Sequence, residues 1–200
     1  MRRINKLNLC IDIDGTVTEP YYWLKRANEY FKTNLKPSDI TVYDIPQILG
    51  VQQKEYDEFY HRYGEMLHQE SKMRPGASEI VYKLYDAGQR IHFVSAREAK
   101  MEKISAEWLA KNNIPLDSLT LLGHANKVGK AAELRSDFFI EDSYENMRQL
   151  AASGFQVLLI DCNYNKGAIP PNVTRVKNWF QIFRLIGQKA NQLSELQIAD

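Results

Sequence analysis

Residues 7–16 read Leu-Asn-Leu-Cys-Ile-Asp-Ile-Asp-Gly-Thr, and this stretch decides which fold the sequence predicts. Every second residue in its first seven positions is apolar, which is the period of a β-strand. These alternating residues are Leu7, Leu9, Ile11 and Ile13. Gly15 and Thr16 break the pattern, so we expect the first strand to end there.

Two acidic residues, Asp12 and Asp14, lie two positions apart at the end of this strand. Side chains with that spacing leave the same face of a strand, about 7 Å apart. Two carboxylates so placed, with no basic residue between them, repel each other, and a metal ion over the pair relieves the repulsion. The stretch therefore indicates a chemical site, with an ordinary strand that ends in an Asp-Gly turn as the alternative.

The composition predicts a globular protein. The chain has 200 residues, of which 44% are hydrophobic and 26% charged, and this length suits one domain with an insertion. A net charge of +1 gives no electrostatic basis for binding a nucleic-acid polymer or a membrane. Only two cysteines occur, Cys10 and Cys162, so we expect a reduced, cytoplasmic protein without a disulfide scaffold. Neither a signal peptide nor an apolar run of membrane-spanning length is expected.

The pattern changes once along the chain, at the Arg-Pro-Gly-Ala sequence of residues 74–77. Before it, residues 17–73 lack strand-like alternation and predict helices at 20–33 and 51–70, with an uncertain stretch at 37–48. After it, short apolar runs alternate with helical segments. The expected strands are 91–95, 119–122, 138–140, 157–160 and 174–176. The expected helices are 77–87, 98–112, 127–134, 146–152 and 179–192.

This alternation predicts an α/β fold with a doubly wound parallel sheet. We expect residues 1–16 and 74–200 to form the core domain. Residues 17–73 would form a small helical cap inserted after the first strand.

Polar residues follow the expected strands at their carboxyl ends, where open parallel sheets bind their ligands. Asp12 and Asp14 end the first strand, and Ser95 and Arg97 follow the second. Glu141 and Asp142 end a later strand, and Lys127 opens the helix before it. Acids, a hydroxyl group and cations therefore converge on one rim of the predicted sheet.

In this order, these residues resemble the haloacid dehalogenase superfamily of phosphotransferases. The sequence Asp12-Ile13-Asp14-Gly15-Thr16 is similar to the first motif of the superfamily, Asp-x-Asp-x-Thr. Ser95 is similar to the second motif, Lys127 to the third, and Phe138 to Asp142 to the acidic fourth motif. The segment 17–73 occupies the position of the helical cap between the first two motifs.

Within the superfamily, the chain is most similar to the C-type 5'-nucleotidases and 5'(3')-deoxyribonucleotidases. The residues that carry this likeness are Arg74-Pro75-Gly76, Ser95-Ala96-Arg97, Ile140-Glu141-Asp142, Tyr164-Asn165 and the stretch from Arg175 to Trp179. The resemblance implies a Mg²⁺-dependent phosphomonoesterase that hydrolyses a small phosphorylated substrate, a nucleoside or deoxynucleoside monophosphate, through an aspartyl phosphate.

The resemblance also implies a role for each motif residue. Asp12 would be the nucleophile, and Asp14 would protonate the leaving oxygen and then activate water. Lys127 would balance the charge of Asp12 and the phosphate, with Lys130 as a competitor one helical turn later. Asp12, the backbone carbonyl of Asp14, and Asp142 would bind Mg²⁺.

The remaining roles are less specific. Thr16, Ser95 and Arg97 would bind substrate, although Thr16 could merely close the turn and Ser95 could be a helix N-cap. Arg97 could instead pair with Glu98 or Asp142. Glu141 stands where related enzymes have an aspartate. It could bind the metal directly or hold one of the metal ligands in place.

Several alternatives stay open at this point. The Tyr21-Tyr22-Trp23 run could stack a nucleobase or belong to the cap core or the cap-to-core contact. The four histidines lack the spacing of a zinc site. A phosphonate hydrolase would need a cap lysine, of which the sequence has Lys25, Lys32, Lys36 and Lys54. Other outcomes are a phosphatase for another small phosphoester, a non-catalytic binding module, and a homodimer formed through the aromatic cap.

Overall fold

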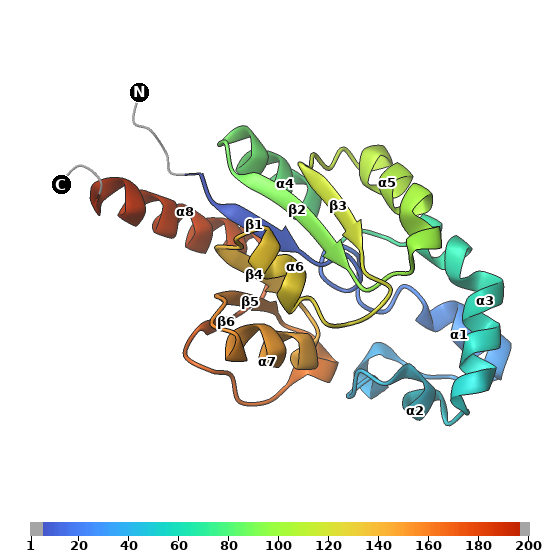
Figure 1. The fold of residues 1–200 in the computed structure, drawn as a ribbon. Coiled ribbons are helices and arrows are strands. Elements are labelled where there is room, and N and C mark those ends of the chain that lie inside the picture. Colours follow the sequence, from blue (N-terminus) through green and yellow to red (C-terminus); the bar gives the residue numbers. More distant parts are fainter. Residues whose placement is uncertain (1–5, 197–200) are drawn as a thin grey trace.

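The computed structural model describes residues 6–196, which form a six-stranded parallel sheet with helices on both faces (Figure 1). The strand order is β3-β2-β1-β4-β5-β6, so the order reverses between β1 and β4. This arrangement confirms the predicted doubly wound α/β fold. The strands are β1 (Asn8–Ile11), β2 (Arg90–Ser95), β3 (Ser118–Leu121), β4 (Phe138–Glu141), β5 (Val157–Ile160) and β6 (Val173–Val176).

Alternation along the strands divides the core into two layers. Leu9 and Ile11 of β1 face one layer, which also contains the buried residues of α4 (Ala77–Asp86), α5 (Glu102–Lys111) and α8 (Trp179–Leu196). Cys10, between them, faces the other layer, against α6 (Val128–Glu133) and α7 (Tyr144–Ala152). The inner strands β1, β4 and β5 are thus buried on both sides, which explains their largely apolar sequences, whereas the edge strands β3 and β6 are partly exposed.

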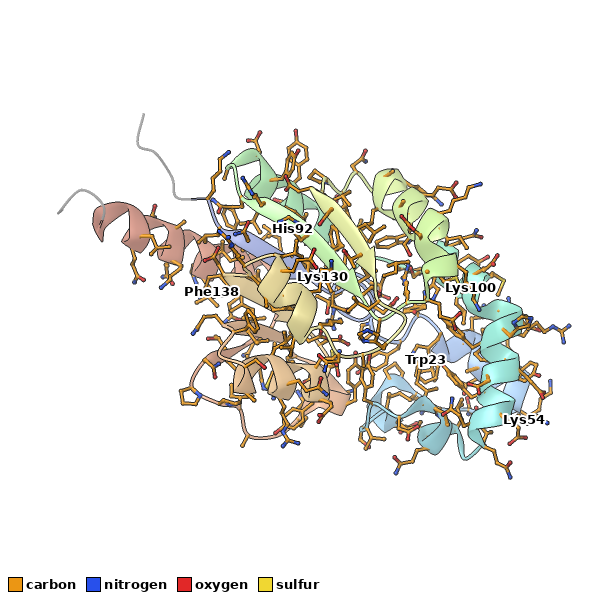
Figure 2. The ribbon with its side chains drawn as sticks, in the orientation of Figure 1. Trp23, Lys54, His92, Lys100, Lys130 and Phe138 are labelled. Carbon is orange, nitrogen blue, oxygen red and sulfur yellow. The ribbon has the colours of Figure 1, made fainter. Side chains whose placement is uncertain are left out.

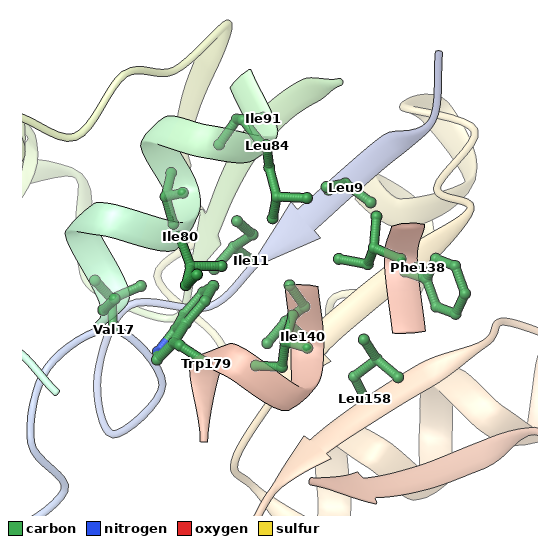
Figure 3. Packing of buried hydrophobic residues seen from close by; sticks show 14 of the residues in the cluster. Leu9, Ile11, Val17, Ile80, Leu84, Ile91, Phe138, Ile140, Leu158 and Trp179 are labelled. Carbon is green, nitrogen blue, oxygen red and sulfur yellow. The ribbon is translucent and has the colours of Figure 1, made fainter. Parts of the chain in front are cut away.

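Trp179 connects the first layer to the end of β1. Its ring is fully buried and packs among Val17, Ile80 and Ile140 (Figure 3). Its indole N–H donates a hydrogen bond of 3.1 Å to the backbone carbonyl of Thr16. The hydrophobic core therefore holds the loop that carries the two aspartates.

The cap follows β1 and contains its own small core. Its elements are α1 (Leu24–Phe31), the 3₁₀ turn η1 (Pro37–Asp39), α2 (Ile45–Leu49) and α3 (Gln53–Glu70). They pack around buried residues that include Trp23, Leu49 and Phe59. Figure 1 shows these helices beside the carboxyl ends of β1, β2 and β3. We predicted two units, a core of residues 1–16 and 74–200 and a cap of residues 17–73. This division stays a prediction.

The chain enters and leaves the cap through a short two-stranded stem. Thr18 and Met73 form an antiparallel bridge. The amide of Arg74 donates to the carbonyl of Val17 at 2.8 Å, and the amide of Glu19 donates to the carbonyl of Lys72 at 2.7 Å.

The structure corrects several predicted boundaries. The strand β1 ends at Ile11 instead of at Gly15, because the amides of Val17 and Thr18 both donate to the carbonyl of Ile13 and turn the chain. The helix expected at 20–33 begins at Leu24. The helix expected at 98–112 is divided into the 3₁₀ turn η2 (Ala99–Met101) and α5. Within residues 6–196, no helix is both long and apolar enough to span a membrane.

Candidate active site

The loop after β1 is pressed against the loop after β4. Asp12 is buried, and its amide donates to the carbonyl of Ile140 at 3.0 Å, which fixes it beside β4. Gly15 has φ +79°, and a Cβ there would lie 2.1 Å from Oδ2 of Asp142. Only glycine therefore fits this position, both for its backbone conformation and for its space.

Lys127 lies between two acids at the centre of the rim. Its ammonium group donates to Oδ1 of Asp12, and to Oε2 of Glu141 at 2.8 Å. The side chain is 1% exposed, so both contacts are shielded from water. Burial opposes the charge of Lys127, but Asp12 and Glu141 outweigh it and raise the lysine pKa. The competitor Lys130 lies on α6 (Figure 2) and pairs with Glu133 at 2.6 Å.

Three buried carboxylates, those of Asp12, Glu141 and Asp142, gather at this point. One oxygen of each lies within 4.8 Å of the others. Burial raises the pKa of Asp12 to about 7, with Glu141 and Asp14 adding to the shift and Lys127 opposing it. Burial, together with Glu141 and Asp12, raises the pKa of Asp142. One lysine does not balance three buried carboxylates, so the site fits a divalent cation with oxygen ligands.

The carboxylates of this group differ in the donors that contact them. Both oxygens of Glu141 are engaged, because Oε2 accepts from Lys127 and Oε1 accepts from the amides of Asp142 and Ser143 at 3.1 and 3.0 Å. Glu141 therefore orients the lysine and its own loop. Asp142 also accepts at both oxygens, but from the neutral hydroxyl groups of Thr16 and Tyr164 and not from a cation. The assignment of Asp12 and Asp142 as the metal ligands stays a prediction.

Asp14 is held by residues of both the core and the cap. Arg97 donates from Nε to Oδ2 at 2.8 Å and from Nη2 to Oδ1 at 2.6 Å. From the cap, the Tyr22 hydroxyl donates to Oδ1 at 2.9 Å, and Nδ1 of His68 lies 3.5 Å from the same oxygen. Burial raises the pKa of Asp14, but Arg97 and His68 outweigh it and hold that pKa well below its usual range.

This pairing corrects one interpretation of Arg97. The sequence offered Glu98 and Asp142 as its partners, whereas the structure pairs it with Asp14. Arg97 is turned inward because Ser105, on α5, accepts a hydrogen bond of 2.8 Å from its Nη1. Glu98 instead pairs with Lys100 at 2.7 Å.

The two hydroxyl residues make local contacts at the same rim. Ser95 is buried, and its Oγ accepts from the amide of Arg97 at 3.2 Å, so it shapes the turn after β2. The Thr16 hydroxyl donates to Oδ1 of Asp142 at 3.3 Å. Their assignment as substrate ligands stays a prediction.

A cavity of about 410 Å³ opens between this rim and the cap. Its core side is formed by Asp14, Gly15, Ala96, Arg97 and Asp142. Its cap side is largely aromatic and apolar, and includes Tyr22, Trp23, Tyr43, Tyr56 and Tyr60. Among residues 6–196, no lysine lines it.

Two contributors to the site, His68 and Tyr164, have no role in the motif pattern. His68 is buried at the end of α3, and its Nε2 lies 2.7 Å from the Tyr60 hydroxyl. The Tyr164 hydroxyl donates to Oδ2 of Asp142. The sequence contains no metal-ligand spacing around His68, and Tyr164 entered only as part of the family likeness. Both act through tertiary contacts that no local pattern encodes.

Comparison with known proteins shows to which family the chain belongs. A family model described as "5' nucleotidase, deoxy (Pyrimidine), cytosolic type C protein" matches residues 5–193. The chain belongs to this family. A nucleotidase of Clostridium acetobutylicum is 43% identical over 183 residues, which are 92% of this chain and 95% of that protein. A 5'(3')-deoxyribonucleotidase of the same organism is 26% identical over 186 residues, covering 89% and 93% of the two chains.

The fold of this type C nucleotidase is shared more widely. A haloacid dehalogenase-like hydrolase from Streptococcus pneumoniae superposes with a TM-score of 0.64 at 9% identity, covering 90% of this chain and 98% of that one. The predicted membership of the haloacid dehalogenase superfamily is confirmed. The protein is a phosphoric monoester hydrolase of the 5'-nucleotidase kind, and the alternative of a non-catalytic module is set aside.

Proposed function

We propose that this type C nucleotidase hydrolyses nucleoside or deoxynucleoside monophosphates in a Mg²⁺-dependent reaction that passes through an aspartyl phosphate on Asp12. The observation that carries the proposal is the buried group of Asp12, Glu141 and Asp142 around Lys127, of which Asp142 lines the cavity under the cap. Membership of the nucleotidase family supports the substrate class.

In the first step, Asp12 attacks phosphorus and the bond from phosphorus to the leaving oxygen breaks. Lys127 holds Oδ1 of Asp12, so Oδ2 is the oxygen available for attack. In the second step, water attacks phosphorus, Asp14 accepts the proton of that water, and the bond from phosphorus to Oδ2 of Asp12 breaks, which releases phosphate and restores the Asp12 carboxylate. The Arg97 pairing keeps Asp14 ionised, as proton acceptance requires, and the lowered pKa also makes it a weaker base. Its other role, as the acid of the first step, requires a proton that the present pairing disfavours.

Asp12, the backbone carbonyl of Asp14, and Asp142 are the groups that would hold Mg²⁺. When bound, the ion offsets the repulsion between the anionic nucleophile and the anionic substrate. Lys127 contributes a second positive charge at Oδ1 of Asp12. Arg97, Ser95 and the amides near them offer hydrogen-bond donors for the substrate phosphate.

The cap side of the cavity supports a substrate with a flat, apolar group. Aromatic side chains such as Tyr43 and Tyr56 line it, and such faces suit a nucleobase. A phosphonate hydrolase would need a lysine in the cavity. Lys25, Lys32, Lys36 and Lys54 are all exposed and none lines the cavity, and Figure 2 places Lys54 on α3.

A phosphate-release screen over nucleotides and sugar phosphates, with and without Mg²⁺, tests the proposal. The expected result is release from nucleoside monophosphates with Mg²⁺ only, and none from the Asp12→Asn variant. Release from sugar phosphates alone would contradict the substrate class. Release by Asp12→Asn at the wild-type rate would contradict the role of Asp12.

A further inference from the structure

Tyr164 contacts the proposed metal ligand Asp142 and the cap at once. It lies on the 3₁₀ turn η3 (Asn163–Asn165) after β5, and its hydroxyl donates to Oδ2 of Asp142. The other oxygen of Asp142 accepts from Thr16 at 3.3 Å, which is long for a bond between a hydroxyl and a carboxylate. Tyr164 is therefore the stronger restraint on the orientation of this carboxylate.

The turn that carries Tyr164 is firmly anchored to the sheet. The buried Asn165 donates from Nδ2 to the carbonyls of Asp142 and Ile160, at 2.7 and 2.8 Å. Arg175 of β6 in turn donates to the side chain and the backbone carbonyl of Asn165, at 2.8 and 2.9 Å. One residue thus ties the loop after β4 to the loop after β5, and the Tyr164 hydroxyl is held at a fixed place relative to Asp142.

The cap meets the ring of the same tyrosine. Tyr21 lies edge-on to it at 6.0 Å between ring centroids, and Tyr43 does so at 5.5 Å. Next to it, the Asn163 side chain donates to the carbonyl of Pro37 at 2.9 Å. The hydroxyl end of Tyr164 therefore faces the acids while its ring supports the cap.

We propose that Tyr164 is a positioning residue for Mg²⁺, whose hydroxyl fixes the Asp142 carboxylate in the orientation that binds the ion. The inference rests on the proposed metal site and adds a residue to it. Loss of a group that orients a metal ligand typically costs about 10- to 100-fold in metal affinity or activity. The Tyr164→Phe substitution removes this hydroxyl and keeps the ring contacts with Tyr21 and Tyr43.

The test is calorimetric titration of the whole protein with Mg²⁺ in the absence of substrate. Tyr164→Phe is expected to bind Mg²⁺ about 10-fold more weakly than wild type. Its kcat is expected to approach the wild-type value once Mg²⁺ is raised to saturation, which a merely structural defect would not allow. The matched control is Tyr144→Phe, which also removes a hydroxyl hydrogen bond, in this case one of 2.6 Å to the backbone carbonyl of Ala168 and not to an acid.

The outcomes separate the hypotheses. Equal Mg²⁺ affinity in wild type and Tyr164→Phe, or an equal loss in Tyr144→Phe, would overturn the role of the Tyr164 hydroxyl. Tyr43→Leu removes a ring contact with Tyr164 and leaves the Tyr164 hydroxyl in place, so its effect is expected on KM. A loss of Mg²⁺ affinity in Tyr43→Leu as large as that in Tyr164→Phe would also overturn the assignment. If wild type neither binds Mg²⁺ nor needs it to release phosphate, the proposed function itself fails.

Discussion

Arg97 contacts Asp14 through two nitrogens of its guanidinium group, at 2.8 Å to one carboxylate oxygen and 2.6 Å to the other. The arginine side chain is 2% exposed and that of the aspartate 26%, so the pair is mostly shielded from solvent. The residue expected to contact substrate therefore also fixes Asp14, the residue proposed to transfer the proton.

This pairing predicts a difference between two substitutions of Arg97. Arg97→Met leaves Asp14 without its partner and is expected to lower the free energy of unfolding by about 3 kcal/mol, as for other broken buried ion pairs. Arg97→Lys keeps the charge but loses the two-point contact, so a smaller loss of stability is expected. Urea unfolding measures both, and equal losses would show that the two-point geometry contributes nothing.

The two lysines near α6 provide a matched pair for activity. Lys127 contacts Asp12 and Glu141, whereas Lys130 contacts Glu133 at the surface. Lys127→Met is expected to lower kcat/KM by about 100-fold or more, because it removes a charge aimed at the reacting groups. Lys130→Met is expected to stay close to the wild-type value. Steady-state phosphate release decides between them, and a larger effect at Lys130 would reverse the assignment.

Glycine is required for space at Gly15 but not at Gly50. Both have positive φ, +79° and +69°, but a Cβ at Gly15 would lie 2.1 Å from Oδ2 of Asp142, whereas one at Gly50 would meet open space. Backbone strain is expected to cost each alanine variant about 1 kcal/mol of stability, and the contact with Asp142 adds a further loss at Gly15 alone. Only Gly15→Ala should also lose most of its activity, as measured by kcat. Full activity in Gly15→Ala would show that the Asp142 loop can move aside.

His68 and His61 lie on the same helix, and only His68 faces the site. Because Nδ1 of His68 lies 3.5 Å from Asp14 and 3.2 Å from the Tyr22 hydroxyl, His68→Asn is expected to lower kcat/KM about 10-fold. The exposed His61 serves as the control, and His61→Asn should leave kcat/KM unchanged. A similar loss in both variants would point to a general disturbance of α3.

Mg²⁺ is also expected to stabilise the folded protein, since the acids gather only in that state. At a concentration about 100 times its dissociation constant, the gain is about 2.7 kcal/mol. Thermal unfolding should therefore shift upward with Mg²⁺ in wild type, return on adding a chelator, and shift much less in Asp142→Asn. An equal shift in that variant would place the ion elsewhere.

Most of the fold was predictable from sequence because burial on both faces of the sheet leaves a clear signal. The alternation in residues 7–13 predicted β1 correctly up to Ile11, and the later apolar runs predicted the other strands. The end of β1 was predicted too late in the sequence. The turn depends on hydrogen bonds from the amides of Val17 and Thr18 to the carbonyl of Ile13, and residue types alone do not predict these bonds. The family assignment followed from four motifs in order and is confirmed.

The site was less predictable wherever a partner lies far away in sequence. Lys127 could be preferred over Lys130 only by its spacing to Asp142. The pairing of Arg97 with Asp14 spans 83 positions, and Tyr164 reaches Asp142 across 22. A long side chain at this rim can reach several acids, so the packing of the folded protein decides which acid it contacts. The catalytic and metal roles of Asp12, Asp14, Lys127 and Asp142 stay predictions that the variants above can test.

The chain enters and leaves the cap through the stem formed by Thr18 and Met73, while cap residues such as Pro37 also contact the core through Asn163. Both connections run side by side, so a cap of different length or shape could be grafted there without altering any sheet strand. The same stem is also a mechanical link, because the Thr18 hydroxyl accepts the amide hydrogen of Gly15 at 2.9 Å. A rotation of the cap about the stem would pull directly on the turn between Asp14 and Thr16.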